Sequence, residues 1–363
     1  MTINRASIPS EFFDITSAKM LRQPQPQRIL AQMWKMALNA SAPSLSGDAG
    51  LMAGRGLTGG GAPAGSIDDH RLMFADPVFG AAVVNVTEAG KRPGHTVKLN
   101  RPVFASTTYT EASRLVASGS QISTTPIDIS AEQVAVTLKR FAGPYDSGNS
   151  RVAPYGLDRF DASMSIHSLG NLVGVHMQDD FDAFINAVLQ TLLYTASTTV
   201  RPEGFTGVDD FTTADSGNLD FNTLARVERD LDEKNIPVFG NGRRVALVTA
   251  KQTQNLKDDP QFARYAEDHA PINPVLSQSY FKTIGGLDLF KSEALSKATN
   301  SSTIAVHRGV AFGPGVLGSA VGDMPRVAFS TDDNYGEDAK LVWLLYGAFS
   351  MLDNRFATQI QST

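Results

Sequence analysis

The sequence predicts an α+β fold in which a long helix, an α/β block and a strand-rich end follow one another along the chain. Three observations support this prediction. Residues 179–197 are strongly amphipathic, residues 218–259 read as helix, strand and helix, and strand patterns fill most of the chain after residue 280. Runs of helix followed by runs of strand, without strict alternation, are typical of the α+β class.

The long helix is the clearest element of the pattern. Its apolar residues recur at intervals of three and four, which places them on one face of a helix. Asp179, Asp180 and Asp182 stand at the start of this run, where the helix dipole favours negative charge. We therefore expect a helix from Asp179 to Ser197. The predicted stripe consists of Phe181, Phe184, Ile185, Val188, Leu189, Leu192 and Leu193.

The α/β block starts with an amphipathic helix in residues 218–237. RRVALVTA, residues 243–250, is a continuous apolar run of the kind that forms a buried strand. A short helix is expected next, in residues 251–259. The apolar face of the first helix consists of Leu224, Val227 and Leu231. Further strands are expected in FKTIGGLDLFKS, STIAVHRGVAFGPG, PRVAFST, KLVWLLYGAFSMLD and RFATQIQ.

Two alternating segments precede the long helix. HTVKLNRPVF (95–104) and EQVAVTLKRF (132–141) predict two strands. The Ser- and Thr-rich segment 107–130 between them has few core residues. We expect it to project from the body as part of a long hairpin, because structureless loops of this length are uncommon unless they carry function.

The first eighty residues do not read as a domain. One short helix is expected in residues 27–40, and the Gly-, Ala- and Ser-rich stretch 41–65 follows it. That stretch has too few large apolar side chains to offset the entropy lost on ordering it. We expect this arm to become ordered by draping over another molecule.

Composition excludes several classes of function. The net charge is −5 and only 19% of residues are charged, so no basic field is available to hold nucleic acid. The chain contains no cysteine, which excludes disulfides, thiolate metal sites and thiol nucleophiles. The longest nearly apolar run, residues 341–352, is far shorter than the roughly 20 residues that span a bilayer. We expect a soluble chain with no membrane partner.

One short motif points to a nucleotide. Gly54, Gly56 and Gly59 match the G-x-G-x-x-G of a dinucleotide-binding turn. That turn needs a buried strand before it and a helix after it. The flanking sequences SAPSLSGDAGLMA and GGAPAGS supply neither, so we interpret GRGLTG as hinge material. A nucleotide-binding oxidoreductase remains the alternative from a different class, and it would need a strand that ends near Ala53.

Other candidate chemistry has simpler explanations. His167 and His176 lie near Asp179 and Asp180, but no metal-binding spacing accompanies them. Residues 331–340 resemble a calcium loop with a misplaced glycine and without the final acidic ligand, and they predict a turn. The acidic pairs Asp209/Asp210 and Asp258/Asp259 lie in polar loops and are interpreted as solvated surface. We predict no catalytic, cofactor-binding or metal-binding residues, no cofactor, and no enzyme activity.

The order of elements from about His95 to Ile360 resembles the major capsid proteins of tailed bacteriophages, which share the Hong Kong 97-type fold. Residues 243–262 are the most specific stretch, since they resemble the family's strand, helix and Asp-x-x-Phe passage. Its residues here are Leu256, Asp259 and Phe262. Residues 304–318 resemble a segment that enters a late helix, around Gly309, Phe312 and Gly313. Residues 325–361 resemble a closing hairpin with a Tyr-Gly turn, Trp343, Asp353 and Arg355.

The resemblance implies a division of the chain into regions. These are an N-terminal arm (1–82), an extended β-hairpin loop (95–146), a peripheral domain (147–217 and 336–363) with a spine helix (179–197), and an axial α/β domain (218–335). It also implies self-assembly as pentamers and hexamers into an icosahedral shell around a double-stranded DNA genome.

Further expectations follow from the same resemblance. The implied location is the virion, with assembly in the cytoplasm of the host bacterium. The implied partners are other copies of the chain, together with scaffolding, portal and decoration proteins and non-specific proximity to packaged DNA. Two related alternatives remain open: an encapsulin-like bacterial compartment, and another virion component such as a tail or decoration protein.

Overall fold

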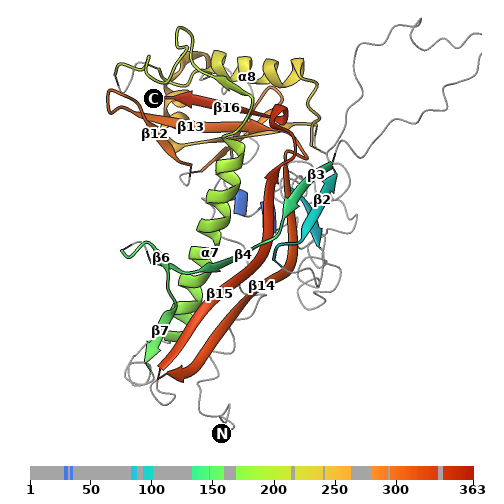
Figure 1. The fold of residues 1–363 in the computed structure, drawn as a ribbon. Coiled ribbons are helices and arrows are strands. Elements are labelled where there is room, and N and C mark those ends of the chain that lie inside the picture. Colours follow the sequence, from blue (N-terminus) through green and yellow to red (C-terminus); the bar gives the residue numbers. More distant parts are fainter. Residues whose placement is uncertain are drawn as a thin grey trace, which may run out of the picture.

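Two large β-sheets joined by one long helix form most of the described part of the chain (Figure 1). The computed structural model describes residues 28–31, 33–35, 83–87, 93–100, 133–146, 148–158, 169–213, 217–239, 242–262, 280–292, 295–333 and 338–363. The glycine motif at 54–59, His167 and the segment 107–130 lie outside these residues.

The five-stranded sheet is built on a long antiparallel hairpin formed by β14 and β15. β1 pairs with β14 in parallel, and β4 and β7 both pair with β15. The bounds are β1 Val83–Thr87, β4 Lys139–Gly143, β7 Tyr155–Asp158, β14 Leu317–Asp333 and β15 Asp338–Met351. The predicted closing hairpin is therefore present, and it runs along the length of the helix α7 (Leu169–Leu193) in Figure 1.

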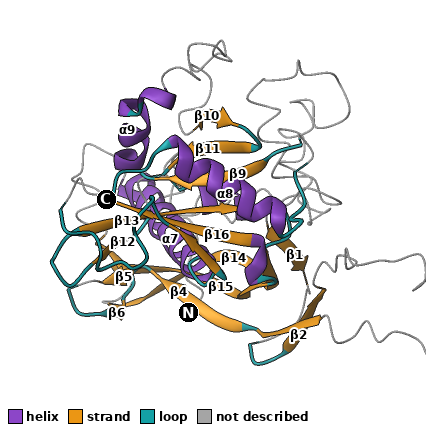
Figure 2. Cartoon of the chain, turned by 90° about the horizontal axis from the view of Figure 1, so that it is seen from above, coloured by secondary structure: helices purple, strands orange, loops and turns teal. Residues whose placement is uncertain are grey.

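The seven-stranded sheet has the order β10-β11-β9-β13-β16-β8, with β12 paired to β13. All five residues of β9 are buried, as expected for the apolar run RRVALVTA. Figure 2 shows the helices α8 and α9 beside this sheet. The bounds are β8 Thr198–Val200, β9 Arg244–Val248, β10 Tyr280–Ile284, β11 Leu287–Lys291, β12 Lys297–Thr299, β13 Ala305–Phe312 and β16 Ala357–Ser362.

The two short helices form where the sequence predicts them. α8 spans Phe221–Glu233 and α9 spans Ala250–Asp258. Asp220 caps the first of them, and Thr249 forms a capping box on the second, which satisfies backbone N–H groups that a helix start leaves unpaired. The predicted apolar face of α8 is fully buried: Leu224, Val227 and Leu231.

The Asp-x-x-Phe passage has a physical role. Leu256 is fully buried, and Phe262 is nearly so. Between them, a side-chain oxygen of Asp259 accepts a hydrogen bond from the backbone N–H of Phe221 at 2.7 Å. Asp259 therefore joins the end of α9 to the start of α8, and the sequence interpretation of this residue as solvated surface was wrong.

The long helix begins earlier than predicted. α7 starts at Leu169, so Asp179, Asp180 and Asp182 lie near its middle and not in its first turn. The apolar stripe continues upstream through Val173. Glycines in this upstream part weaken the local helical signal. The stripe residues Phe181, Ile185, Leu189 and Leu193 are completely buried, as predicted.

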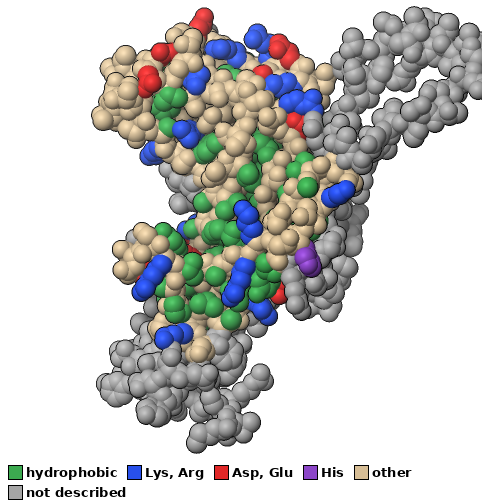
Figure 3. Space-filling view, viewed as in Figure 1, with side chains coloured by type: hydrophobic (Ala, Val, Ile, Leu, Met, Phe, Trp, Pro, Cys, Tyr) green, Lys and Arg blue, Asp and Glu red, His purple; other side chains and the backbone are tan. Residues whose placement is uncertain are grey.

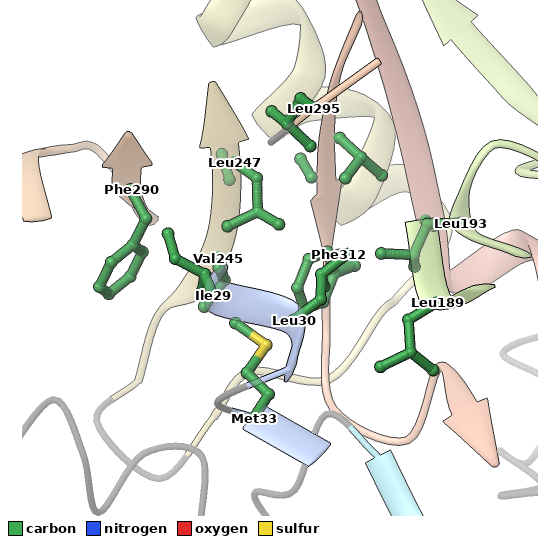
Figure 4. Close-up of a cluster of buried hydrophobic side chains, with 14 of the residues drawn as sticks. Ile29, Leu30, Met33, Leu189, Leu193, Val245, Leu247, Phe290, Leu295 and Phe312 are labelled. Atoms are coloured by element: carbon green, nitrogen blue, oxygen red, sulfur yellow. The ribbon is translucent and has the colours of Figure 1, made fainter. Parts of the chain in front are cut away.

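Part of the predicted arm lies in the chain's own core. Residues 29–31 and 33–35 are helical, and Trp34 is completely buried. Figure 4 shows Ile29, Leu30 and Met33 together with side chains from α7, β9 and β13. The expectation that this arm is ordered only by another molecule is therefore wrong for residues 28–35, which we call the N-terminal segment. Its large apolar side chains distinguish it from the Gly-rich stretch that follows.

Deletion tests this packing. Removing residues 1–36 is expected to lower the unfolding free energy by at least about 3 kcal/mol, the lower end for losing one large aromatic side chain from a core. Removing residues 1–27 keeps the buried side chains and serves as the matched control. Urea unfolding followed by circular dichroism measures both. Equal midpoints for the two truncated chains would contradict the burial of the N-terminal segment.

Sheet membership differs from the predicted division in two places. β14 falls in the range expected for the axial domain, yet it pairs with β15 in the five-stranded sheet. β16 falls in the range expected for the peripheral domain, yet it pairs with β13 and β8.

Residues 304–318 do not lead into a helix, contrary to the sequence prediction: β13 is followed by a turn at Gly315, whose φ is 71°, and then by β14. Neighbouring strands on both sides of β13 hold it in the extended conformation.

Two hairpins lie beside the main sheets. β2 (Thr96–Asn100) and β3 (Gln133–Thr137) pair antiparallel, which confirms the two predicted strands. Their apolar residues form a second small core with Ala320, Ala348 and Leu352. The other hairpin consists of β5 (Tyr145–Asp146) and β6 (Arg151–Val152).

Candidate functional site

The most completely buried ion pair in the described part of the chain joins the N-terminal segment to the middle of α7. Lys35 Nζ lies 2.5 Å from Asp182 Oδ1, and both side chains are 3% exposed. Arg28 Nη1 lies 2.6 Å from Asp179 Oδ1 in a more exposed position. Asp179 and Asp182 are therefore balanced by cations from the N-terminal segment and not by the helix dipole.

Burial shifts both members of the Lys35–Asp182 pair towards their neutral forms. It raises the pKa of Asp182 to about 6, although Lys35 and Arg28 act in the opposite direction. It lowers the pKa of Lys35 despite the attraction of Asp182. In both cases the cost of removing the charge from water exceeds the mutual attraction. The pair therefore defines where the segment sits without adding much net stability.

The Asp182 pKa predicts a pH dependence. Because the folded-state value of about 6 lies above the ordinary 3.8, this carboxyl contributes stability that is complete below pH 3.8 and is lost as pH rises through about 6. Between about pH 4 and about pH 7, the wild-type chain is expected to lose on the order of 1–3 kcal/mol of unfolding free energy relative to Asp182→Asn. Urea unfolding of both chains at several pH values measures this difference. Parallel profiles for the two chains would exclude the shift.

Asp180 forms a second junction on α7. Its Oδ2 accepts a hydrogen bond from Trp343 Nε1 of β15 at 2.7 Å, and its Oδ1 accepts one from the backbone N–H of Tyr145 in β5 at 3.4 Å. The Trp343 ring packs edge-on against Phe181, with 5.2 Å between ring centroids. One carboxylate thus connects the helix, the long hairpin and the base of the small β5–β6 hairpin.

The N-terminal segment makes a similar junction with the other long strand. Trp34 Nε1 donates a hydrogen bond to Ser319 Oγ of β14 at 2.9 Å. The Trp34 ring also lies 5.9 Å from Phe181 and 6.0 Å from Phe349, centroid to centroid. These contacts and the ion pairs fix the segment between α7 and the five-stranded sheet. Nothing in the sequence pattern marked Lys35 as the partner of Asp182 or Trp34 as the partner of Ser319.

The residues considered for chemistry do not converge. His176 is exposed on α7, with its ring 6.4 Å from that of Tyr155, while Asp179 and Asp180 are engaged in the contacts above. Within the described ranges, no three His, Asp or Glu side chains are grouped to hold a metal ion. The glycine motif and His167 lie outside those ranges, and residues 331–340 are described only up to Asp333 and from Asp338.

Asp209 and Asp210 accept hydrogen bonds from backbone N–H groups of surface loops, so they do more than face solvent as the sequence analysis supposed. Asp210 Oδ2 accepts hydrogen bonds from the backbone N–H groups of Gly207 at 2.6 Å and Thr206 at 2.7 Å. Asp209 Oδ1 accepts one from the N–H of Ser301 at 2.9 Å. Backbone donation from Gly207 and from Ser301 lowers the pKa of Asp210 and of Asp209, respectively. The Asp210 bonds shape the loop 206–210, and the Asp209 bond joins this loop to the one at Ser301.

None of the described helices combines the length and apolarity needed to cross a membrane.

No protein-family model and no curated protein matches the chain. Solved structures do match. The capsid of Ralstonia phage GP4 is 13% identical, with a TM-score of 0.52 over 78% of this chain and 87% of that one.

Two further structures are similar in the same way. They are the capsid of the cyanophage P-SCSP1u (12% identical, TM-score 0.49, 77% of this chain and 86% of that one) and the mature capsid of bacteriophage PhiM1 (11% identical, TM-score 0.47, 77% and 85%). At such low identity a likeness establishes the fold alone, and the GP4 match, with the higher TM-score, carries it. The chain therefore has the Hong Kong 97-type α+β fold of tailed-phage capsid proteins, as its sequence predicted.

Proposed function

We propose that this chain is the major capsid protein of a tailed bacteriophage. In this proposal it self-assembles as pentamers and hexamers into an icosahedral shell that encloses double-stranded DNA. The observation that carries the proposal is the fold shared with the capsid of Ralstonia phage GP4 across 78% of the chain. The order of elements in the sequence supports it independently of that match.

Two properties of the chain suit a protein that assembles with other copies: the small core of one hairpin and the net charge. The β2–β3 hairpin has only a small core with the ends of β14 and β15. Hairpins gain independent stability from further strands or packed layers, and obligate interfaces of about 2,000–5,000 Å² supply such layers. A mildly acidic chain also suits a container, because a net charge of −5 does not grip packaged DNA through its phosphates.

We propose the same regional division as the sequence analysis, with three changes. The arm comprises residues 1–82, but residues 28–35 are part of the folded body. The extended loop covers 95–146, and the remaining ranges form the peripheral and axial domains, except that β14 joins the peripheral domain and β16 the axial domain, because they pair with the strands of those sheets. The protein acts as a structural component of the virion and not as an enzyme. It assembles in the host cytoplasm with scaffolding, portal and decoration proteins as further partners.

The test is assembly of the purified full-length chain. Size-exclusion chromatography with light scattering is expected to show capsomers or larger particles, and negative-stain microscopy of the heaviest fraction is expected to show closed shells. Nuclease treatment then reports whether shells made in a bacterial host protect DNA. A monomer at every concentration and salt condition would contradict the proposal, and shells that hold a protein cargo without DNA would favour an encapsulin-like compartment.

A further inference from the structure

The N-terminal segment is held on the body by apolar side chains along its middle and by an ion pair at each end. Its large apolar side chains are at most 3% exposed. Arg28 pairs with Asp179 at its start. Lys35 pairs with Asp182 at its end. Residues 36–82 separate the segment from β1, so it is able to leave α7 without displacing that strand.

The two ion pairs differ in their access to water. The side chain of Asp179 is 41% exposed, so the charges of its pair with Arg28 stay hydrated. Lys35 and Asp182 have lost almost all of their contact with water. The attraction between two such charges returns only part of the free energy spent on removing them from water. The buried pair is therefore the costly point of a contact that its apolar side chains favour.

A second polar group lies beside Asp182. Asn186 is one turn further along α7, on the same face of the helix. It is 3% exposed, and its side-chain oxygen accepts no hydrogen bond from the described residues. A buried acceptor without a donor lowers the stability of the arrangement that buries it. Two neighbouring polar groups of α7 are thus buried with fewer partners than they have in water.

In the described residues, the charged groups that act on Asp182 come from the N-terminal segment and from α7 itself. Lys35 and Arg28 favour its ionised form, and Asp179 opposes it. None of these groups belongs to the five-stranded sheet. Hydrophobic side chains gather over the middle of the molecule in Figure 3, where Figure 1 draws α7. Loss of water outweighs the two cations, and burial raises the pKa of Asp182 to about 6.

We infer that the N-terminal segment is a proton-controlled latch, which lies on α7 while Asp182 is protonated and is released more often once Asp182 ionises. Release returns water to Asp182 and to the ammonium group of Lys35. The sheets stay in place on release, because residues 28–35 form a strand in neither of them. The inference concerns the single chain and does not depend on the proposed function.

The direction of the effect follows from the two states of Asp182. Its pKa is about 6 in the docked form, and in the released form it returns towards the ordinary 3.8. Docking therefore has its full strength below pH 3.8 and loses strength as pH rises through about 6. Between about pH 5 and about pH 7.5, the ratio of released to docked chains is expected to rise about tenfold.

Lys35 acts in the opposite direction. Burial lowers its pKa from the ordinary 10.5, so loss of its proton favours the docked form as pH rises into the alkaline range. The test therefore compares slightly acidic with neutral solutions, and it includes a variant in which Asp182 no longer titrates.

The experiment reports release through a single thiol. The chain contains no cysteine, and Ala31 lies within the segment with no exposed surface. In Ala31→Cys, a maleimide reaches the thiol only after release. The labelling rate of the folded chain is divided by that of the same chain in denaturant at the same pH, which removes the intrinsic pH dependence of the thiol. This ratio is expected to rise about tenfold from about pH 5 to about pH 7.5.

Two acidic positions on α7 provide matched variants in the Ala31→Cys background. Asp182→Asn is expected to reduce the pH effect to less than about twofold, because an amide does not titrate. Asp179→Asn keeps Asp182 and is expected to retain the tenfold rise. A third chain, Ala246→Cys, places the thiol in β9, where Ala246 is also completely buried. It reports unfolding of the whole chain and is expected to be labelled more slowly than Ala31→Cys at every pH.

Labelling of Ala31→Cys that does not change with pH would overturn the inference, as would a change that survives Asp182→Asn. Equal labelling of Ala31→Cys and Ala246→Cys would overturn it too, because release would then require unfolding of the whole chain. These results leave the proposed function standing. A chain that releases its segment as expected but never assembles would overturn the proposed function alone.

Discussion

Lys35→Met is expected to lower the free energy of unfolding by about 3–5 kcal/mol, since it leaves a buried carboxylate without its partner. Lys35 and Asp182 are each 3% exposed, so water cannot replace the lost ammonium group. The substitution removes the buried contact that holds the N-terminal segment against α7, so it is expected to release that segment from the helix. Urea unfolding of the unassembled subunit, followed by the fluorescence of Trp34 and Trp343, measures it.

The double variant Lys35→Met/Asp182→Leu separates charge from packing. It is expected to recover to within about 1 kcal/mol of the wild type or to exceed it, because a buried ion pair often contributes no more than two apolar residues of similar size. Arg229→Met is the surface control: the Arg229–Glu233 pair is 71% and 67% exposed, and its loss is expected to cost less than about 0.5 kcal/mol. A double variant as unstable as Lys35→Met would show that the pair itself holds the segment.

Trp343→Ala is expected to cost about 3–5 kcal/mol. The indole is 2% exposed, packs against Phe181 and Phe184, and donates a hydrogen bond to Asp180. Its removal separates α7 from β15 and leaves the Asp180 carboxylate with the longer hydrogen bond from the Tyr145 N–H alone. Trp343→Phe keeps most of the apolar contact and is expected to cost less. Thermal and urea unfolding of the unassembled subunit measure both variants.

Gly143 supplies a second check on this packing. A Cβ added there would lie 2.4 Å from the Trp343 indole, so Gly143→Ala is expected to cost about 1–3 kcal/mol through overpacking. In the Trp343→Ala background that cost is expected to fall, because the clashing ring is gone. Additive effects of the two substitutions would contradict the contact between Gly143 and the ring.

Local sequence patterns were sufficient to predict the helices and the first strand of the α/β block. The apolar spacing of Leu224, Val227 and Leu231 and the apolar run of β9 each act within a few residues, so they can be read without knowing the fold. The antiparallel β2–β3 strands were predicted for the same reason. Alternation of side chains along a strand is a local property.

The middle of α7 shows where local reasoning failed. Asp179 and Asp182 at the head of an apolar run indicated a helix start, since acidic residues favour the first turn. Their actual partners, Arg28 and Lys35, are separated from them by most of the first half of the chain. No spacing rule connects residues so far apart, and an ion pair of this kind is decided only when the segments pack.

By itself, the sequence determined the fold class, the block from α8 to α9 and the strands of the closing hairpin, because periodicity and capping depend on near neighbours. Only the tertiary structure decided that residues 28–35 belong to the core, that β14 joins the five-stranded sheet and β16 the seven-stranded one, and that Asp179 and Asp182 of α7 pair with cations. These features depend on hydrophobic burial and charge pairing between distant segments. Burial and pairing of this kind are properties of the packed chain and not of any stretch within it.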